Sequence, residues 1–436
     1  MSSIKTKGKA LVCAILERQA MQLRAKHRFT IVTVSGSIGK TSTKQAIAHI
    51  LTESGKRVRF QSGNYNDRIT VPLVLFDQDL PGLFNIPAWL KIFWANRRLI
   101  RRGPGFDVAV LELGTDGPGQ IERFAYLRPD LAVVTAITPE HMEFFGTLDA
   151  VAQEEMAVAA YTQQLLVSDE IPEHYLEGIQ AKRYGFSEGA TYRIQASGLT
   201  KNGQRVEVYA DSEKASDSVI SLLGKQGAMI ALAGAATAHE LGTSWEAVTA
   251  AMRTLRPVSG RMQLLPGVHG STLIDDTYNA SPEAVLAALD VLVALPAKRR
   301  IAVLGSMNEL GEESPAAHKL VAEAANTLPL DAVFTLGKEA KQYMAPHLIS
   351  DDGRSISSYC AWDTVVERGF AELPWQIDED TVILFKGSQN GVFAEEALKL
   401  VLAEPADAQK LVRQSASWLA KKQKQHHELA MCDDRL

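Results

Sequence analysis

The stretch VTVSGSIGKTSTKQAIAHIL, residues 32–51, decides the fold because it joins an apolar run to a small-residue turn and then to a helical pattern. β-Branched residues dominate the run that begins at Ile31, which favours a buried strand. Apolar residues recur at helical spacing in the second half, from Ile47 to Leu51. The stretch therefore predicts a strand, a phosphate-binding loop and a helix in succession.

The turn between strand and helix, GSIGKTS at residues 36–42, has the chemistry of a phosphate site. Its two glycines let backbone N–H groups turn towards an anion, and the following helix presents its positive end. Lys40 would reach the outer phosphates of ATP, and Thr41 or Ser42 would offer a hydroxyl to Mg²⁺. A glycine turn without a ligand is the alternative, which the Lys-Thr-Ser run disfavours. The predicted ATP-binding residues of this loop are Gly36, Ser37, Gly39, Lys40, Thr41 and Ser42.

Length and composition limit the class of protein. With 436 residues the chain is too long for one ordinary core, so we expect two or three domains. Hydrophobic and charged contents of 46% and 22% are typical of a soluble globular protein, and the net charge of −5 disfavours nucleic acid as a partner. Cys13, Cys360 and Cys432 lie far apart in the sequence. We therefore expect neither a disulfide framework nor a zinc cluster, and a reducing, cytoplasmic setting.

Strand-like and helix-like segments alternate along the chain, which predicts an α/β fold with largely parallel sheets. Residues 190–210 alternate around an Asn-Gly turn and favour antiparallel strands. Proline and glycine punctuate the chain near Val258, where a new series of strands begins. We expect an N-terminal amphipathic helix at 1–28, a central ATP-binding domain at 29–258, a C-terminal α/β domain at 259–412 and a polar tail at 413–436.

Two segments resemble membrane-active sequences, yet neither is long enough to span a bilayer. Residues 1–29 combine a basic start with a short apolar run that Glu17 and Arg18 interrupt, which favours an amphipathic helix over a signal peptide. Residues 83–102 place tryptophans before a cluster of arginines. Such a helix either lies on a membrane surface or packs against its own domain. We expect no transmembrane segment, and peripheral membrane contact stays open.

Polar residues stand where the predicted strands end, and the carboxyl ends of parallel strands are where open α/β sheets bind ligands. Glu112 closes the run VAVLELG at 108–114 and is a candidate Mg²⁺ ligand beside the phosphate loop. His141 follows the next strand, LAVVTAI at 131–137, and either reaches the same crevice or caps the surface. The sequence thus predicts a nucleotide and metal site at one edge of the central sheet.

Two further polar motifs follow strands in the second half of the chain. The first, DDTYNASP, offers Asp276, Tyr278 and Asn279 to the ribose, base or phosphates of a nucleotide, although an Asx-turn before a helix explains part of it. The second, KGS, places Lys386 and Ser388 at a strand end, where they either hold an anionic acceptor or form a turn.

The order of these motifs resembles that of the Mur ligase family, the ATP-dependent amide-forming enzymes of peptidoglycan assembly, and most closely its D-alanyl-D-alanine-adding ligases. The phosphate loop alone is shared more widely, including by the folate polyglutamating ligases, so the specificity lies in the set. The motifs are TVSGSIGKTSTK (33–44), GNYNDRITVPL (63–73), LELGTDGPGQI (111–121), TAITPEHMEFFG (135–146), IDDTYNASPEAVLAALDVL (274–292), VLGSMNELG (303–311) and FKGS (385–388).

The resemblance implies a central P-loop ATPase domain with a mostly parallel sheet, a C-terminal Rossmann-like ligase domain, and the cofactors ATP and Mg²⁺. In this family ATP phosphorylates a substrate carboxylate, and an amine then attacks the acyl phosphate to form an amide. Positioning and charge neutralisation do most of the work in such phosphoryl transfer. The substrates implied are D-alanyl-D-alanine, or a similar amine, and a muramoyl-peptide-like acceptor.

Residue roles follow from the matching motifs. Lys40 would stabilise the transferring phosphoryl group, Thr41 and Glu112 would hold one Mg²⁺, and His141 would help to hold a second. The remaining roles implied by the resemblance fall on Arg261 and Asp276 for the nucleotide, Asn64 and Asn66 for the acceptor, and Lys386 and Ser388 for the incoming amine.

Two departures from the family pattern bear on the substrate and the second metal. The family's enzyme of this step has a further N-terminal domain that holds the uridine diphosphate of its acceptor, whereas here a short helix precedes the phosphate loop. We therefore expect an acceptor that is carried differently. The family's carbamylated lysine is matched by Glu155, a permanent carboxylate on a shorter arm. Glu155 joins Lys40, Glu112 and His141 as a catalytic candidate.

Two other functions stay open. One is a ligase for a different acid and amine, for example amidation of a cell-wall precursor with ammonia from a partner, although the zinc-ribbon cysteines of such relatives do not occur here. The other is a nucleotide-binding scaffold without ligase activity, since a fold alone does not establish a function. Such a scaffold would close its domains on ATP and then bind a cell-wall enzyme. For the ligase we expect a monomer whose partners are a small-molecule or peptide acceptor and an amine substrate.

Overall fold

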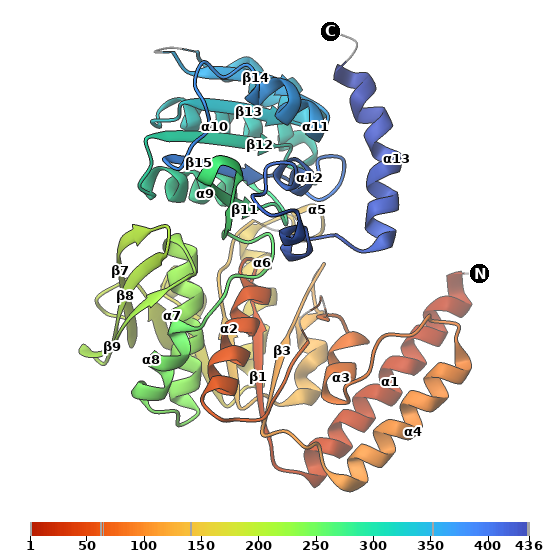
Figure 1. The fold of residues 1–436 in the computed structure, drawn as a ribbon. Helices are drawn as coiled ribbons and strands as arrows, with labels where there is room; N and C mark the ends of the chain where they lie inside the picture. The colour runs from red at the N-terminus through yellow and green to blue at the C-terminus, as the bar shows by residue number, and fades with distance from the viewer. Residues whose placement is uncertain (1, 62, 64, 140–141, 351–352, 434–436) are drawn as a thin grey trace. The chain divides into compact units, whose positions relative to one another are not determined.

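The computed structural model describes residues 2–433 apart from 62, 64, 140–141 and 351–352, and it describes no side chain at 2–6 or 142–143. Asn64 and His141 of the predicted site therefore lie outside the described residues. The chain forms two compact units (Figure 1). Unit 1 comprises Met1–Ala196, Arg205–Ile220 and Gln226–Leu255, and unit 2 comprises Ser197–Gln204, Ser221–Lys225 and Arg256–Leu436.

The described strands form two mixed sheets in which parallel pairs predominate. The nine-stranded sheet belongs to unit 1 except for residues 197–204 at the tip of its β7–β8 hairpin. Its strand order is β2 (Val58–Arg59), β3 (Val108–Glu112), β1 (Thr30–Ser35), β4 (Leu131–Val134), β5 (Gln164–Ser168), β6 (Lys182–Gly185), β7 (Tyr192–Thr200), β8 (Gly203–Ala210) and β9 (Glu213–Ile220). In unit 2 the order is β10 (Gln263–Pro266), β11 (Thr272–Asp276), β15 (Thr381–Lys386), β12 (Arg299–Gly305), β13 (Ala332–Leu336) and β14 (Ser355–Tyr359). The predicted α/β fold is confirmed.

Helices accompany both sheets (Figure 1). Those of the first part of the chain are α1 (Ser2–Lys26), α2 (Lys40–Glu53), α3 (Thr70–Leu75), α4 (Ile86–Arg102), α5 (Met142–Phe145), α6 (Leu148–Met156), α7 (Gly224–Glu240) and α8 (Trp245–Arg253). Those of the second part are α9 (Pro282–Ala294), α10 (Ser314–Asn326), α11 (Trp362–Thr364), α12 (Ala394–Lys399) and α13 (Ala416–Asp433).

The central strands of unit 1 are buried on both faces, which is why their sequences are nearly continuous apolar runs. β1 pairs in parallel with β3 on one side and with β4 on the other. Val34 lies opposite Glu112, and Ser35 lies opposite Val134. This register brings the phosphate loop, Glu112 and the segment after β4 to the same edge of the sheet.

The hairpin expected at 190–210 is present as β7 and β8, which only residues 201–202 separate. So short a link joins antiparallel strands, whereas parallel strands need a crossover of a dozen residues or more. Of the Asn-Gly pair, Gly203 supplies the left-handed backbone angle, which glycine adopts without strain. Gly203 has a φ of +125°.

The N-terminal helix packs on α4 through apolar residues at helical spacing. Cys13 and Leu16 of α1 lie in one cluster with Trp89 and Ile92 of α4. A buried amide pair reinforces the contact, because Asn96 Nδ2 donates to the Gln19 side chain at 2.8 Å. Residues 83–102 therefore do pack against their own unit, as one of the two sequence interpretations holds. Among the described residues, no helix has both the length and the apolar character needed to cross a bilayer.

In unit 2, β11, β15, β12, β13 and β14 run parallel, and β10 pairs antiparallel with β11. Asp276, the last residue of β11, lies opposite Lys386, the last residue of β15. The two polar motifs of the second half thus meet at the carboxyl edge of this sheet, as parallel pairing requires.

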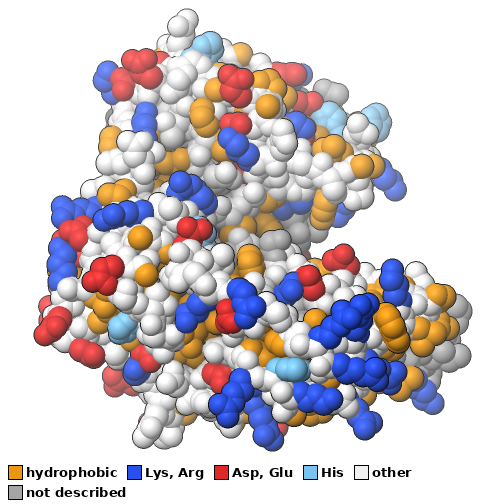
Figure 2. All heavy atoms as spheres, turned by 60° about the horizontal axis from the view of Figure 1, so that its bottom comes forward, with side chains coloured by type: hydrophobic (Ala, Val, Ile, Leu, Met, Phe, Trp, Pro, Cys, Tyr) orange, Lys and Arg blue, Asp and Glu red, His pale blue; other side chains and the backbone are white. Residues whose placement is uncertain are grey.

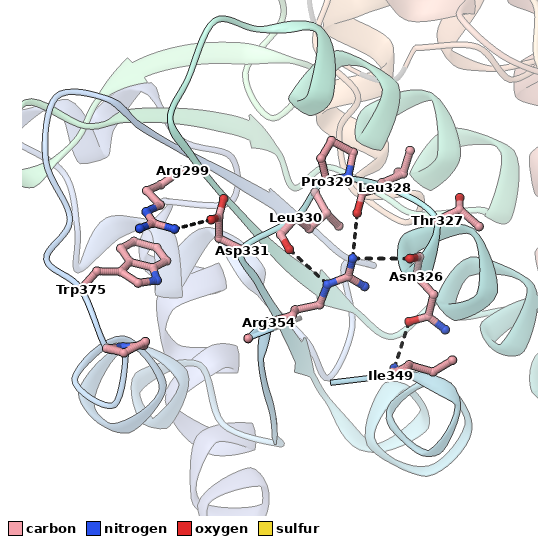
Figure 3. Close-up of a pocket in the computed structure, with 12 residues that line it drawn as sticks. Arg299, Asn326, Thr327, Leu328, Pro329, Leu330, Asp331, Ile349, Arg354 and Trp375 are labelled. Atoms are coloured by element: carbon pink, nitrogen blue, oxygen red, sulfur yellow. Dashed lines mark hydrogen bonds and ion pairs between the residues drawn. The ribbon is translucent and has the colours of Figure 1, made fainter. Parts of the chain in front are cut away.

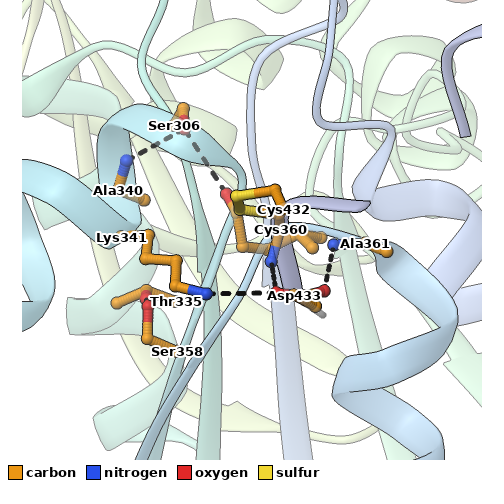
Figure 4. Close-up of a disulfide and its surroundings, with 10 residues drawn as sticks. Ser306, Thr335, Ala340, Lys341, Ser358, Cys360, Ala361, Cys432 and Asp433 are labelled. Carbon is orange, nitrogen blue, oxygen red and sulfur yellow. Dashed lines mark hydrogen bonds and ion pairs between the residues drawn. A yellow bond between two sulfur atoms is a disulfide. The ribbon is translucent and has the colours of Figure 1, made fainter. Parts of the chain in front are cut away.

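The cysteine prediction is wrong for two of the three residues. Cys360, just after β14, and Cys432, near the end of α13, form a disulfide with Cα atoms 6.0 Å apart (Figure 4). Asp433 accepts hydrogen bonds from the backbone N–H groups of Cys360 and Ala361 at 2.7 and 2.9 Å. Separation along the sequence did not reveal this pairing, because α13 returns to the sheet within the segment expected as a polar tail. Cysteine spacing thus no longer supports a reducing setting.

Candidate functional site

The phosphate loop connects β1 to the first turn of α2 and is pinned to the segment after β4. Gly36 and Gly39 have φ angles of +115° and +87°, which glycine adopts without strain. The Ser37 N–H donates to the Ala136 carbonyl at 2.8 Å, and Thr135 Oγ1 donates to the Ile38 carbonyl at 2.6 Å. Thr135 was not a sequence candidate, because its role depends on a neighbouring strand.

Lys40 begins α2 and folds back over the loop. Its Nζ donates to the carbonyls of Gly36 and Ser37, the latter at 3.1 Å, and lies 4.0 Å from Glu155 Oε1. Glu155, on α6, is 1% exposed, and its Oε2 accepts a hydrogen bond from the Gly36 N–H at 2.6 Å. The Glu155 carboxylate therefore lies against the loop backbone and accepts from a backbone N–H group of the kind that binds anions in such loops.

Glu112 gathers three partners from the same edge of the sheet. Its Oε1 accepts hydrogen bonds from Thr41 Oγ1 at 3.1 Å and from Asn66 Nδ2 at 3.3 Å. Its Oε2 forms an ion pair with Lys44 Nζ at 2.9 Å, and both side chains are 2% exposed. The structure thus unites the predicted residues Thr41, Asn66 and Glu112. Lys44, one helical turn after Lys40, was missed, although spacing by four residues places both on one helix face.

A hydroxyl and a carboxylate are the oxygen donors that suit Mg²⁺, which usually takes one or two protein ligands together with phosphates and water. Thr41 and Glu112 therefore fit such an ion chemically. Within the part of the chain that the structure describes, no group of three or more His, Cys, Asp or Glu side chains is arranged to hold a metal. Ser42, the alternative hydroxyl, is buried in α2.

The unit 2 candidates form a second, separate polar cluster. Lys386 Nζ pairs with Asp276 Oδ2 at 2.5 Å and donates to the Asn279 carbonyl at 3.0 Å. The guanidinium carbon of Arg261 lies 4.3 Å from the centroid of the Tyr278 ring, a cation–π contact. Tyr278 and Asn279 are exposed, whereas Lys386 is buried.

Ser388 is buried and closes a turn. Its Oγ accepts a hydrogen bond from the Asn308 N–H at 2.9 Å and lies 3.5 Å from the Ala280 carbonyl. This geometry agrees with the turn interpretation of the KGS motif. The substrate role of Ser388 stays a prediction that follows from the resemblance.

Asp275, next to the candidate Asp276, is fully buried beneath this cluster. Burial raises the pKa of Asp275 to about 6, and hydrogen bonds from Thr277 oppose that rise. The Gly260 N–H donates to Asp275 Oδ2 at 3.1 Å, so the carboxyl joins the segment before β10 to β11.

Below the 275–279 turn, a buried ionic network holds its backbone. Arg413 donates to the carbonyls of Thr277 and Tyr278 at 2.6 and 2.9 Å, and it pairs with Glu395 at 2.7 Å. Lys422 of α13 pairs with the same glutamate at 2.8 Å. Nothing in the local sequence signalled these residues, because they join the turn from distant segments.

A cavity of about 780 Å³ lies at the opposite, amino edge of the unit 2 sheet (Figure 3). Arg354 lies against it and donates to the carbonyls of Leu330 and Leu328 at 3.1 and 2.7 Å, which secures the chain after α10. Arg299 pairs with Asp331 at 2.6 Å. The polar side chains named here form hydrogen bonds and ion pairs within the fold. The cavity is not part of either candidate cluster.

Comparison with known families assigns the class. Residues 95–238 match the Mur ligase middle domain, and residues 260–389 match the Mur ligase glutamate ligase domain. The chain belongs to the Mur ligase family, whose members are ATP-dependent ligases.

Three curated relatives of the chain share one name. The chain is similar to UDP-N-acetylmuramoyl-tripeptide--D-alanyl-D-alanine ligase of Escherichia coli, with 29% identity over 84% of this chain and 75% of the relative. It is also similar to the ligase of that name from Synechocystis, with 29% identity over 72% of this chain and 63% of the relative. The ligase of that name from Bacillus subtilis is 26% identical over 86% of this chain and 76% of the relative. The chain thus spans less than two thirds of the Synechocystis ligase.

Solved structures share the fold. MurF from Acinetobacter baumannii superimposes with a TM-score of 0.71 at 20% identity, covering 90% of this chain and 79% of that one. MurF ligase from Thermotoga maritima, solved in complex with ADP, has a TM-score of 0.71 at 22% identity, and the match covers 89% of this chain and 83% of that one. At these low sequence identities, both comparisons establish that the fold is shared.

Proposed function

We propose that the chain is an ATP-dependent ligase that joins D-alanyl-D-alanine, or a similar amine, to the carboxylate of a muramoyl-peptide-like acceptor. The observation that carries this proposal is the meeting of Lys40, Thr41 and Glu112 at the carboxyl edge of the unit 1 sheet. The names of the relatives support the choice of substrates. Because the reaction consumes ATP, we place it in the cytoplasm.

The proposed chemistry has two steps. An oxygen of the acceptor carboxylate attacks the γ-phosphorus of ATP, and ADP leaves. The amine nitrogen then attacks the acyl carbon, phosphate departs, and the nitrogen loses a proton as the amide forms. The phosphate loop and the N-terminus of α2 would bind the phosphates, and Lys40 would turn from the loop carbonyls towards the transferring group.

Thr41 and Glu112 would hold one Mg²⁺, which supplies charge neutralisation at the phosphates when bound. Lys44 would orient Glu112 through their ion pair, since a buried carboxylate needs a paired charge. His141, assigned by resemblance to a second Mg²⁺, belongs to the same proposal. Glu155 would keep the loop in register through the Gly36 N–H and supply the carboxylate that the family takes from a carbamylated lysine.

Roles in unit 2 are proposed from the motif matches. Arg261, Asp276, Tyr278 and Asn279 would contact the nucleotide. Lys386 and Ser388 would orient the amine substrate, and the ion pair between Lys386 and Asp276 would set the charge at this edge. Asn64 and Asn66 complete the set on the acceptor side.

The test measures phosphate release and product mass with Mg-ATP, D-alanyl-D-alanine and one of two acceptors. The acceptors are a UDP-muramoyl tripeptide and the same muramoyl tripeptide without its nucleotide. We expect an amide product with one of them, and we expect Lys40→Ala to lower its rate by about 100-fold or more, since one lost transition-state contact has that effect. Lys319→Ala, a substitution of an exposed lysine on α10, is the control and keeps the rate.

A product only with the nucleotide-free acceptor would assign the chain to a step that uses free muramoyl peptides. Absence of product with both acceptors would contradict the proposed substrates. Nucleotide binding that persists without any acceptor-dependent hydrolysis would instead favour the scaffold function.

A further inference from the structure

Helix α4 has an apolar face that points away from the unit 1 core. Its inner face buries Trp89 and Ile92 against α1. On the outer side, Ile86, Leu90 and Trp94 recur every four residues and are 66%, 63% and 64% exposed. Three large apolar side chains in one row along a helix form a patch rather than scattered surface residues.

Basic residues continue the same side of α4 towards its C-terminus. We define the α4 outer face as eight exposed side chains of this helix: Ile86, Leu90, Lys91, Trp94, Arg97, Arg98, Arg101 and Arg102. The helix contains no aspartate or glutamate. The guanidinium carbon of Arg98 lies 5.9 Å from the Trp94 ring centroid, so the apolar and basic halves adjoin.

The neighbouring helix extends the positive charge. Residues 7–26 of α1 include five basic residues, of which Arg24 forms an ion pair with Asp130 at 2.6 Å. The one acidic residue of this segment, Glu17, accepts a hydrogen bond from Arg68 at 3.1 Å. The whole chain, by contrast, has a net charge of −5. Figure 2 shows lysine and arginine side chains gathered, with hydrophobic side chains between them, over the end of unit 1 formed by α1 and α4. Positive charge thus gathers at this end of unit 1, although the chain as a whole is acidic.

We propose that the α4 outer face docks on the surface of an anionic lipid bilayer, with the helix lying in the plane of the membrane interface. Aliphatic and tryptophan side chains on one face, beside arginines, are the features that bind interfacial helices to acidic lipids. Tryptophan prefers the depth of the headgroups, and arginine pairs bidentately with phosphate. This proposal does not depend on the reaction that the site catalyses.

Lipid fits this face better than a nucleic acid does. Nucleic acid binding uses basic side chains that follow the phosphates and aromatic rings that stack on bases. Ile86 and Leu90 have neither function, yet they are as exposed as Trp94. Burying these two aliphatic side chains among acyl chains removes apolar area from water. A polynucleotide surface would bury much less of this apolar area.

The first experiment is co-sedimentation of the full chain with vesicles of phosphatidylcholine alone and of phosphatidylcholine with about 30% phosphatidylglycerol, since basic segments respond to anionic lipid. We expect binding to the anionic vesicles that weakens in about 0.5 M salt, where the Debye length is a few ångströms. The double variant L90E/W94E should weaken binding at least about tenfold. Arg97, Arg98, Arg101 and Arg102 changed together to glutamine should remove most of the salt dependence.

Two exposed residues of α10 provide matched controls. Leu320→Glu places the same charge on a surface leucine that is 48% exposed, and Lys319→Gln removes a surface charge. Both controls should sediment like the unsubstituted chain. Circular dichroism and thermal unfolding of every variant should match it, because the changed side chains are exposed.

A second measurement places the helix by depth. Brominated lipids quench tryptophans that enter the bilayer, and the quenching lost in Trp94→Phe reports on that residue alone. We expect the loss to be largest with bromine near the headgroups. Failure to bind any vesicle, or equal binding by L90E/W94E, would overturn the proposal. So would self-association that requires Leu90 and Trp94 without lipid, or RNA that binds the face more tightly than the anionic vesicles.

Discussion

At the scale of single residues, the pair formed by Lys44 and Glu112 is the clearest case of a charge that must keep its partner. Both side chains are 2% exposed, and their charged atoms are 2.9 Å apart. Neither group has access to bulk water, so each depends on the other for compensation. Because Glu112 also bonds Thr41, the stability of the pair and the geometry of the proposed Mg²⁺ site are linked.

We predict that Lys44→Met lowers the free energy of unfolding of unit 1 by about 3 kcal/mol, because it leaves the Glu112 carboxylate buried and unpaired. Urea denaturation measures the change. The double variant K44M/E112Q should recover part of the loss, and Lys319→Met on the surface should stay within about 0.5 kcal/mol of the unsubstituted chain. Equal stability of Lys44→Met and Lys319→Met would contradict this account.

Asp275 predicts a dependence of stability on pH. Its pKa in the folded state is about 6, above the value of about 3.9 for an unfolded aspartate. As pH rises from 4 to 6 the unfolded chain ionises at this residue while the folded chain stays protonated, so stability falls. The loss approaches about 3 kcal/mol at pH 7.

Asp275→Asn removes the ionisation. We expect the stability of the original chain minus that of the variant to decrease by about 2 kcal/mol between pH 4 and pH 7 in urea denaturation. Parallel pH curves for the two proteins would mean that Asp275 is ionised in the folded state.

At the scale of elements, the phosphate loop depends on two glycines for different reasons. A Cβ at Gly36 would collide with Thr135 Oγ1 and lie 2.9 Å from the Ala136 backbone N. A Cβ at Gly39 would meet Thr43 Oγ1 only at 4.0 Å. Both have positive φ angles, so alanine strains the backbone at each, but only Gly36 also lacks the space.

We predict that Gly36→Ala weakens binding of a fluorescent ATP analogue at least about tenfold more than Gly39→Ala, since 1.4 kcal/mol of additional distortion has that effect. Equilibrium titration gives both affinities. Similar losses in the two variants would show that backbone strain, and not the contact with the segment after β4, limits the loop.

Helix α13 is the other element whose attachment can be tested. The disulfide between Cys360 and Cys432 closes a loop of 72 residues. Nearer the start of α13, Lys422 pairs with buried Glu395 of α12. We predict that Cys432→Ser lowers the free energy of unfolding of unit 2 by up to about 4 kcal/mol under oxidising conditions. With a reducing agent the two proteins should unfold alike. A difference that persists after reduction would assign the effect to packing of the thiol.

At the scale of the whole molecule, each unit carries one of the two candidate clusters. The proposed function assigns nucleotide contacts to residues of both clusters, with Lys40 in unit 1 and Arg261 and Asp276 in unit 2. A non-hydrolysable ATP analogue at 100 times its Kd should stabilise the state that binds it by about 2.7 kcal/mol. We predict slower amide hydrogen exchange at residues 36–43 and at residues 275–280. Lys40→Ala should abolish both effects. Protection confined to unit 1 would contradict the nucleotide roles of Arg261 and Asp276.

Much of the site was predictable because it follows local rules. Glycines and a lysine between a buried strand and a helix indicate a phosphate loop, and a strand-terminal Glu112 lies beside it once the strands are parallel. Lys44, Thr135 and Arg413 could not be predicted, since each acts on a segment that only the folded chain brings near. The cysteine interpretation failed for the same reason.

The sequence by itself determined the alternation of strands and helices, the loop chemistry and the family, because periodicity and motif order are properties of the chain in one dimension. The tertiary structure decided which side chains compensate one another: Lys44 with Glu112, Lys386 with Asp276, and Cys360 with Cys432. It also decided that α4 buries one face and exposes the other. Pairing and burial depend on distances through space, and these arise only when the strands take their register and the helices pack.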